Sequence, residues 1–247
     1  MLILVVQRLF YDVPNRRTVS QRVTLPIPTG WWRGLGLLAN VFAVESFVDE
    51  LAANAGIDPL QFRLNNLGTD DTGVRMRRAL ETVAEMANWG GALPEGHALG
   101  IAGCIDAGTI ATQVAEVSLD RTSGEIRVHN VWAVVEPGKV INPDGSIAQT
   151  QGSIIMGLSS TLIEEVTVKD GRIEAGNFDR YPLLTMARAP HIEVQMLERP
   201  NADPTGMGEP PIGPIAAAVG NAVFALTGVR MRQLPFTPER VLAALGS

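Results

Sequence analysis

One carboxylate, Glu209, lies in a turn that has glycines before it and prolines after it, in the stretch Gly206-Met207-Gly208-Glu209-Pro210-Pro211. Gly206 and Gly208 let another group approach the main chain closely because they carry no side chain. Pro210 favours an extended backbone at Glu209, since a proline disfavours helical angles in the residue before it. An acid fixed on a rigid turn, beside the free N–H groups of a following helix, suits a general base. The simpler alternative is a loop carboxylate paired with an arginine.

A second glycine-rich stretch, Trp32-Arg33-Gly34-Leu35-Gly36, precedes a helical pattern. Gly34, Gly36 and Ala39 match the G-x-G-x-x-A spacing of a dinucleotide-binding loop. That interpretation requires a clean preceding strand and an acidic residue about 20 positions later, and two prolines interrupt the segment before the loop. The remaining alternatives are a loop that offers backbone N–H groups to an anionic or oxo ligand, or an ordinary tight turn.

The segment Gln149-Thr150-Gln151-Gly152 begins a predicted helix that is rich in small residues. Its amides could hydrogen-bond a heterocyclic cofactor. From the residues alone, close helix packing through Gly152, Ser153 and Gly157 is the simpler interpretation.

The composition excludes several classes of function. The 247 residues include 26 acidic and 20 basic residues, a net charge of −6, and no basic run, which argues against nucleic-acid binding. Cys104 is the single cysteine, so a disulfide framework or an iron–sulfur cluster held by this chain is excluded. The three histidines have no metal-ligand spacing, so we expect no zinc or non-haem iron site.

The sequence contains no recognisable targeting signal. The apolar run Leu2–Val6 is too short for a signal peptide or a membrane span. We therefore expect a cytoplasmic location, or a periplasmic one if an exported partner carries the chain.

Apolar periodicity predicts a mixed α+β fold. Helices are expected over 41–55, 58–66, 74–88, 146–162, 214–227 and from 237, and strands over 19–25, 109–119, 125–135 and 192–196, with a hairpin at 166–175. The change from helices to strands divides the chain into residues 1–91 and 92–247, with residues 92–95 as a linker.

Two amphipathic patterns predict which side chains face the core. In the helix over 41–55, Glu45 and Asp49 are expected to point to solvent, away from an apolar face that includes Leu51. In the strand over 125–135, Ile126, Val128, Trp132 and Val134 are expected on one face, with His129 on the solvated face.

Three motifs together resemble one family. The Trp32–Gly36 loop, the Gln149–Gly152 segment and the Gly208–Pro211 turn occur in the order found in molybdenum hydroxylases, the xanthine oxidase and aldehyde oxidase family. The sequence is similar in particular to the catalytic subunit of isoquinoline 1-oxidoreductase-like enzymes, also over Val44–Leu51 and Phe178–Pro182. The resemblance extends from about Tyr11 to Leu245.

The resemblance implies the α+β fold of a molybdopterin-binding domain, of which this chain is the C-terminal part. It implies a molybdenum held by a pyranopterin, in bacteria usually the cytosine dinucleotide form, with Glu209 as the general base. The residues that would bind this cofactor are Arg33, Gly34, Gly36, Gln149, Gly152 and Gly208. Trp32 and Leu35 would face the substrate, and Leu35 stands where many relatives have an aromatic residue.

The family also implies partners. Relatives carry a long N-terminal half with further cofactor loops, so a chain carrying that half is expected, and this chain is interpreted as a split subunit or a truncated gene product. A separate iron–sulfur subunit with 2Fe-2S clusters is expected as the electron relay. The implied reaction is hydroxylation of an N-heterocycle or oxidation of an aldehyde, with water as the oxygen source. The alternatives are a non-catalytic remnant that binds a sister subunit, and a hydrolase that uses Glu209 but lacks a second carboxylate in its motif.

Overall fold

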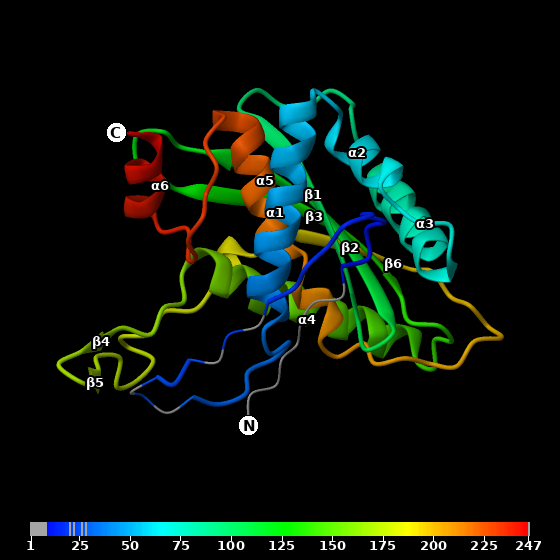
Figure 1. Ribbon diagram of the computed structural model, residues 1–247. Coiled ribbons are helices and arrows are strands. Elements are labelled where there is room, and N and C mark those ends of the chain that lie inside the picture. Colours follow the sequence, from blue (N-terminus) through cyan, green and yellow to red (C-terminus); the bar gives the residue numbers. More distant parts are fainter. Residues whose placement is uncertain (1–8, 20, 22, 26, 28, 247) are drawn as a thin grey trace.

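The computed structural model describes residues 9–246 except residues 20, 22, 26 and 28. A four-stranded mixed sheet in the order β1-β2-β3-β6 forms its centre (Figure 1). These strands are β1 (His97–Asp106), β2 (Thr109–Leu119), β3 (Ile126–Glu136) and β6 (His191–Met196). β1, β2 and β3 are antiparallel neighbours, whereas β6 runs parallel to β3. The predicted α+β class is confirmed.

Helices cover both faces of this sheet. α5 (Ile215–Thr227) packs on β1 and β2 with α1 (Leu37–Ala55) against it, and α3 (Asp71–Met86) packs on the opposite face (Figure 1). The remaining elements are α2 (Pro59–Asn65), α4 (Pro143–Leu162), α6 (Pro238–Leu245), the 3-10 turns η1 (Met186–Arg188) and η2 (Pro210–Ile212), and the hairpin strands β4 (Val168–Lys169) and β5 (Arg172–Ile173). The hairpin projects from the body of the molecule (Figure 1).

Local capping signals explain where several elements begin and end. The Asp58 side chain accepts a hydrogen bond from the Gln61 N–H at 2.9 Å, as an N-cap does. Gly228 ends α5 in the left-handed conformation, with φ of 72°. Asp170 and Gly171 both have positive φ, 51° and 75°, which suits the predicted two-residue hairpin turn.

The buried face of α1 differs from the prediction. Glu45 and Asp49, expected at the surface, are 0% and 4% exposed, and Leu51, expected in the core, is exposed. The cause is pairing: Arg63 contacts both carboxylates, and Arg230 contacts Asp49 at 2.9 Å. A charged residue is buried at low cost only when an opposite charge accompanies it, and a pattern of apolar residues does not show such a partner.

Two predictions about strands were wrong. The described residues among 19–25 form no strand, and residues 20 and 22 lie outside the described residues. In β3 the side chains change faces at a β-bulge: Val117 pairs with Val128 and Glu116 with Asn130, which leaves His129 as the extra residue. Trp132 therefore does not share a face with Val128.

His129 is half-buried instead of solvated. Its Nε2 lies 2.8 Å from the Ser118 hydroxyl, and its ring stacks on His97 at 4.3 Å between centroids. The bulge thus brings together two histidines that are 32 positions apart in the sequence.

One segment among the described residues, Pro210–Thr227, is apolar and long enough to cross a membrane by composition alone. However, 78% of it is buried inside the protein, so it behaves as a core helix and does not show a membrane span. The division of the chain at residue 91 stays a prediction.

Candidate active site

The Trp32–Gly36 loop is a tight turn that leads into α1. The Leu35 N–H bonds to the Trp32 carbonyl at 2.9 Å, and the Leu37 N–H bonds to the Gly34 carbonyl at 2.6 Å. Gly34 has φ of +79°, and a Cβ there would lie 2.6 Å from the Ile212 side chain. Both the backbone angle and the close contact therefore require glycine at this position.

The Glu209 turn differs from the extended backbone that Pro210 favours. Glu209 has φ of −111° and ψ of −40°, and its carbonyl accepts from the Ile212 N–H at 3.0 Å, which begins the 3-10 turn η2. The proline preference is overridden at this turn, where Pro210, Pro211 and Ile212 are all buried.

The loop and the turn meet although 175 positions separate them. The Arg33 Nε donates to the Gly208 carbonyl at 2.7 Å, and the Gly34 N–H donates to the Glu209 Oε1 at 3.2 Å. The Arg33 Nη2 also donates to the Gln149 carbonyl at 3.3 Å, and the Gln149 Nε2 reaches the Gly208 carbonyl at 3.4 Å. The structure therefore brings Arg33, Gly34, Gln149, Gly208 and Glu209 into one site.

Arg33 and Glu209 carry opposite charges, which attract each other in this site. Burial lowers the pKa of the Arg33 guanidinium, and the negative charge of Glu209 opposes that shift. The pair thus places one cation and one anion on the two segments that meet here.

The other predicted residues lie around this centre. Trp32 and Leu35 belong to the same loop as Arg33, with Trp32 39% exposed and Leu35 half-buried. Gly36 is the N-cap residue of α1. Gly152 is exposed on α4, and a Cβ there would meet no atom within 4 Å. Gly152 is therefore not the close-packing residue of α4; Gly157 is, since its Cβ would lie 2.6 Å from Ile215.

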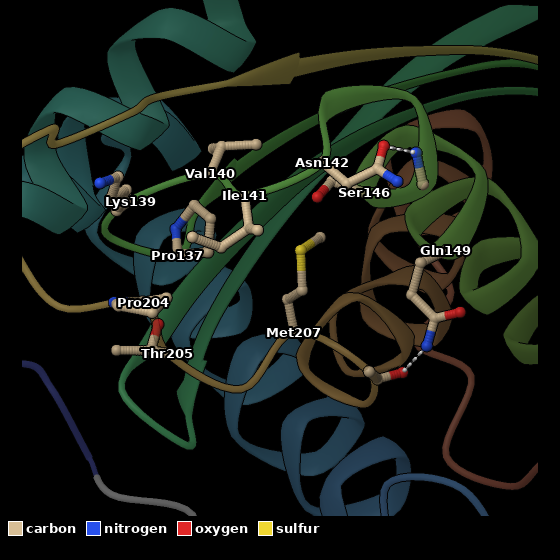
Figure 2. A pocket seen from close by; sticks show the side chains of 12 residues that line it. Pro137, Lys139, Val140, Ile141, Asn142, Ser146, Gln149, Pro204, Thr205 and Met207 are labelled. Atoms are coloured by element: carbon tan, nitrogen blue, oxygen red, sulfur yellow. Dashed lines mark hydrogen bonds between the residues drawn. The ribbon is translucent and has the colours of Figure 1, made fainter.

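A pocket of about 360 Å³ adjoins the site. Figure 2 shows the residues around it, with the Gln149 amide hydrogen-bonded to a backbone oxygen, that of Gly208, on one side. The lining residues are Pro137, Lys139, Val140, Ile141, Asn142, Gly145, Ser146, Gln149, Pro204, Thr205, Met207 and Gly208. The N-terminal turn of α4 faces this pocket, where the Asn142 side chain caps the Gly145 N–H at 3.0 Å.

A second carboxylate, Asp106, was missed by the sequence analysis. It ends β1, and the next residue, Ala107, accepts from the Gly206 N–H at 3.3 Å, so the turn after β1 touches the loop before Glu209. Burial raises the pKa of the Asp106 carboxyl, and the charge of Glu209 raises it further. Only the position of β1, which was not predicted, could have signalled this residue.

No group of three or more His, Cys, Asp or Glu side chains within the described residues is arranged to hold a metal ion. The side chains of the site are the Arg33 guanidinium, the Gln149 amide and the Glu209 carboxylate, each of which makes a hydrogen bond to the backbone of another segment.

Comparison with known proteins identifies the family of the chain. Residues 33–190 match the family model of the molybdopterin cofactor-binding domain. The chain is 35% identical, over 96% of its length, to a nicotinate dehydrogenase subunit of Pseudomonas putida, and covers 21% of that protein. It is 36% identical, over 92% of its length, to the beta subunit of isoquinoline 1-oxidoreductase from Brevundimonas diminuta, and covers 29% of it.

The fold also resembles that of quinoline 2-oxidoreductase from Pseudomonas putida 86, with a TM-score of 0.77 at 17% identity, covering 89% of this chain and 53% of that chain. The family model and the fold together define a domain of the molybdopterin-binding class. The chain belongs to the xanthine oxidase family of molybdenum hydroxylases, and it spans about a fifth to a third of the length of the curated relatives that it matches.

Proposed function

We propose that this chain forms part of the catalytic subunit of a molybdenum hydroxylase, with Glu209 as its general base. The reaction is hydroxylation of an N-heterocycle or oxidation of an aldehyde, with water as the oxygen source. The observation that carries the proposal is the junction of the Arg33–Gly34 loop with the Gly208–Glu209 turn.

The residues around the site fit the cofactor. The pocket beside Gly208 offers the Gln149 amide, the Ser146 hydroxyl and the N-terminal turn of α4, and Lys139 adds a positive charge. Helix N-termini and lysines favour the anionic groups that a pyranopterin dinucleotide carries. Gly152, with open space where its Cβ would be, leaves room beside α4. We propose the cytosine dinucleotide form, held by Arg33, Gly34, Gly36, Gln149, Gly152 and Gly208.

When bound, the molybdenum cofactor would supply the two-electron oxidation. The chain's own contribution is proton transfer: a Glu209 carboxylate oxygen accepts the proton released when oxygen from water is added to the substrate. The Gly34 N–H holds Oε1 of that carboxylate, and Arg33 fixes the backbone just before it. A base held in this way is oriented before the substrate arrives. Trp32 and Leu35 would face the substrate.

The relatives named above are subunits, and this chain covers only part of each. We therefore propose two partners: a chain that carries the rest of the catalytic subunit, and an iron–sulfur subunit with 2Fe-2S clusters that removes electrons. The complex is proposed to lie in the cytoplasm, or in the periplasm if a partner is exported.

The test uses the complex purified with its neighbouring gene products, with Glu209→Gln as the variant. Loss of a general base lowers turnover by about 10²–10⁴-fold, and molybdenum content should stay unchanged. Glu174→Gln, at an exposed residue of the hairpin segment, is the matched control. Near-normal turnover of Glu209→Gln would refute the role of Glu209.

The second candidate function is that of a non-catalytic chain which binds a sister subunit of such a complex. It would co-purify with a sister chain, contain no molybdenum and show no turnover. Hydrolysis that persists without molybdenum would instead indicate acid–base chemistry by Glu209 and Asp106.

A further inference from the structure

Two side chains of the central sheet donate hydrogen bonds to the turn that follows Glu209. Pro210 and Pro211 are buried, so their carbonyl groups need hydrogen-bond partners within the protein. Each carbonyl receives a hydrogen bond from a side chain, one from β1 and one from β2, and the Pro210 carbonyl also accepts from the Gly213 N–H at 3.1 Å. Neither donor was singled out as part of the site from the sequence.

Gln113 is the first donor. It lies on β2, is 0% exposed, and is flanked along the same face by the small apolar residues Ala111 and Ala115. Its Nε2 donates to the Pro211 carbonyl at 2.6 Å, while its Oε1 has no hydrogen-bond partner among the described residues. A buried amide with one unsatisfied oxygen costs stability. The role of Gln113 is therefore better explained by its hydrogen bond to the Pro211 carbonyl than by core packing.

Cys104 is the second donor. It lies on β1, is 0% exposed, and its Sγ donates to the Pro210 carbonyl at 3.3 Å. Burial raises the pKa of this thiol well above its usual value, so it keeps the proton that it donates. The sulfur also packs against Gly213, where a Cβ would lie 3.0 Å from it.

The same turn also contacts the Gly34 loop. The Gly34 N–H donates to the Glu209 Oε1, and Ile212 packs so closely under Gly34 that no Cβ fits between them. Two β-strands and the loop before α1 therefore hold three consecutive residues after Glu209, and the carboxylate itself.

We propose that Gln113 and Cys104 are positioning residues, which hold the backbone that aims the Glu209 carboxylate at the substrate. The inference rests on the proposed role of Glu209 as general base. It predicts that loss of either donor lowers the rate of the chemical step, because a shift of about 1 Å in a catalytic group can cost about 100-fold in rate.

The variants are Gln113→Leu, which keeps most of the volume but cannot donate, and the pair Cys104→Ser and Cys104→Ala. The serine keeps an O–H donor and the alanine does not. Thr112→Val is the matched control: Thr112 is also buried on β2, and its hydroxyl donates to the Ala79 carbonyl on α3, at the opposite face of the sheet.

Activity of the assembled complex is the first measurement. We expect Gln113→Leu and Cys104→Ala to lower kcat by about 10–100-fold with little change in KM, Cys104→Ser to restore most of kcat, and Thr112→Val to leave kcat near normal. Equal kcat for Gln113→Leu and Thr112→Val would overturn the inference.

The second measurement does not need turnover. Cys104 is the single cysteine of the chain, so the rate at which a thiol reagent labels it, read by mass spectrometry of its peptide, reports opening of the Glu209 turn. We expect labelling to be at least about tenfold faster in Gln113→Leu than in Thr112→Val, at denaturant concentrations where both remain folded. Equal labelling rates would overturn the inference even in a preparation without activity.

The two proposals can fail separately. If Glu209→Gln keeps full turnover, the general base is wrong whatever the labelling shows. If Glu209→Gln is inactive but Gln113→Leu matches Thr112→Val in kcat and labelling, the base is right and the positioning role of Gln113 is wrong.

Discussion

Glu116 is the centre of a polar group on β2 that is independent of the candidate site. Its carboxylate accepts from the Asn130 side chain at 2.6 Å and lies 2.6 Å from the His97 Nδ1. Burial alone would raise the pKa of Glu116, but the hydrogen bonds from Asn130 and His97, with the charges of His97 and His129, outweigh it and lower the pKa. The ionised form of Glu116 is therefore the one that stabilises the fold.

We expect Glu116→Gln to lower the free energy of unfolding by about 1.5–3 kcal/mol at neutral pH, the range for hydrogen bonds to charged groups. A carboxyl whose folded-state pKa is depressed contributes stability above its unfolded pKa of about 4.3 and loses it as the pH falls through the folded value. The difference between variant and wild type, measured by urea unfolding at each pH, should therefore shrink between about pH 5 and about pH 3. A difference that is constant with pH, or that Glu174→Gln reproduces, would contradict this.

Single residues of the site could be predicted only where the few residues around them form an unusual local sequence. Glu209 between glycines and prolines, and Gly34 beside Arg33, were visible in this way, and the family resemblance placed them together. Gln113 was not visible, because its partner Pro211 lies 98 positions away and a glutamine in a strand carries no local signal.

At the scale of elements, the contact between α5 and β1 depends on a glycine, Gly100, which has no side chain. A Cβ on Gly100 would lie 2.1 Å from the Ala218 carbonyl oxygen and 2.3 Å from the Ala222 nitrogen, both backbone atoms of α5. Small residues on both sides let this helix lie close to the sheet that supports the Glu209 turn. The packing therefore leaves no room for an added methyl group.

Gly100→Ala is expected to destabilise the protein by about 1–3 kcal/mol, the usual cost of overpacking a core. The matched control is Gly152→Ala, where a Cβ meets open space. That change is expected to stabilise α4 by about 0.5–1 kcal/mol, because alanine is the better helix former. Urea unfolding followed by circular dichroism measures both. Equal effects of the two substitutions would show that Gly100 does not set the distance between α5 and β1.

Elements with local signals could be predicted, and elements without them could not. Capping residues and apolar stripes identified the helices, and Asp170-Gly171 identified the hairpin. β1 was missed because it is buried along almost its whole length and rich in glycine and alanine, so its sequence does not alternate between apolar and polar residues.

At the scale of the whole molecule, a buried ion network joins the helices of the first ninety residues to the sheet and to α5. The Glu45 carboxylate accepts from the Tyr11 hydroxyl at 2.8 Å, from the Arg63 Nε at 3.0 Å and from the Gly103 N–H at 3.1 Å. Arg230, which follows α5, pairs with Asp49 beside it. Burial alone would lower the pKa of Arg63, but the electrostatic interactions with Glu45, Tyr11 and Asp49 and the hydrogen bond to Glu45 together outweigh it and raise the pKa, so the guanidinium is charged.

Arg63→Met should therefore destabilise the protein by about 3–5 kcal/mol, because it leaves the buried Glu45 carboxylate without its partner. Arg232→Met is the control, since Arg232 is exposed and pairs with Glu50 at the surface, where such a pair contributes about 0–1 kcal/mol. Since Glu45 bonds to both α2 and β1, we also expect wild-type protein to unfold in one transition, with tryptophan fluorescence and circular dichroism giving the same midpoint in urea. Two separate transitions, with Arg63→Met shifting only one of them, would show instead that residues 1–91 and 92–247 fold as independent units.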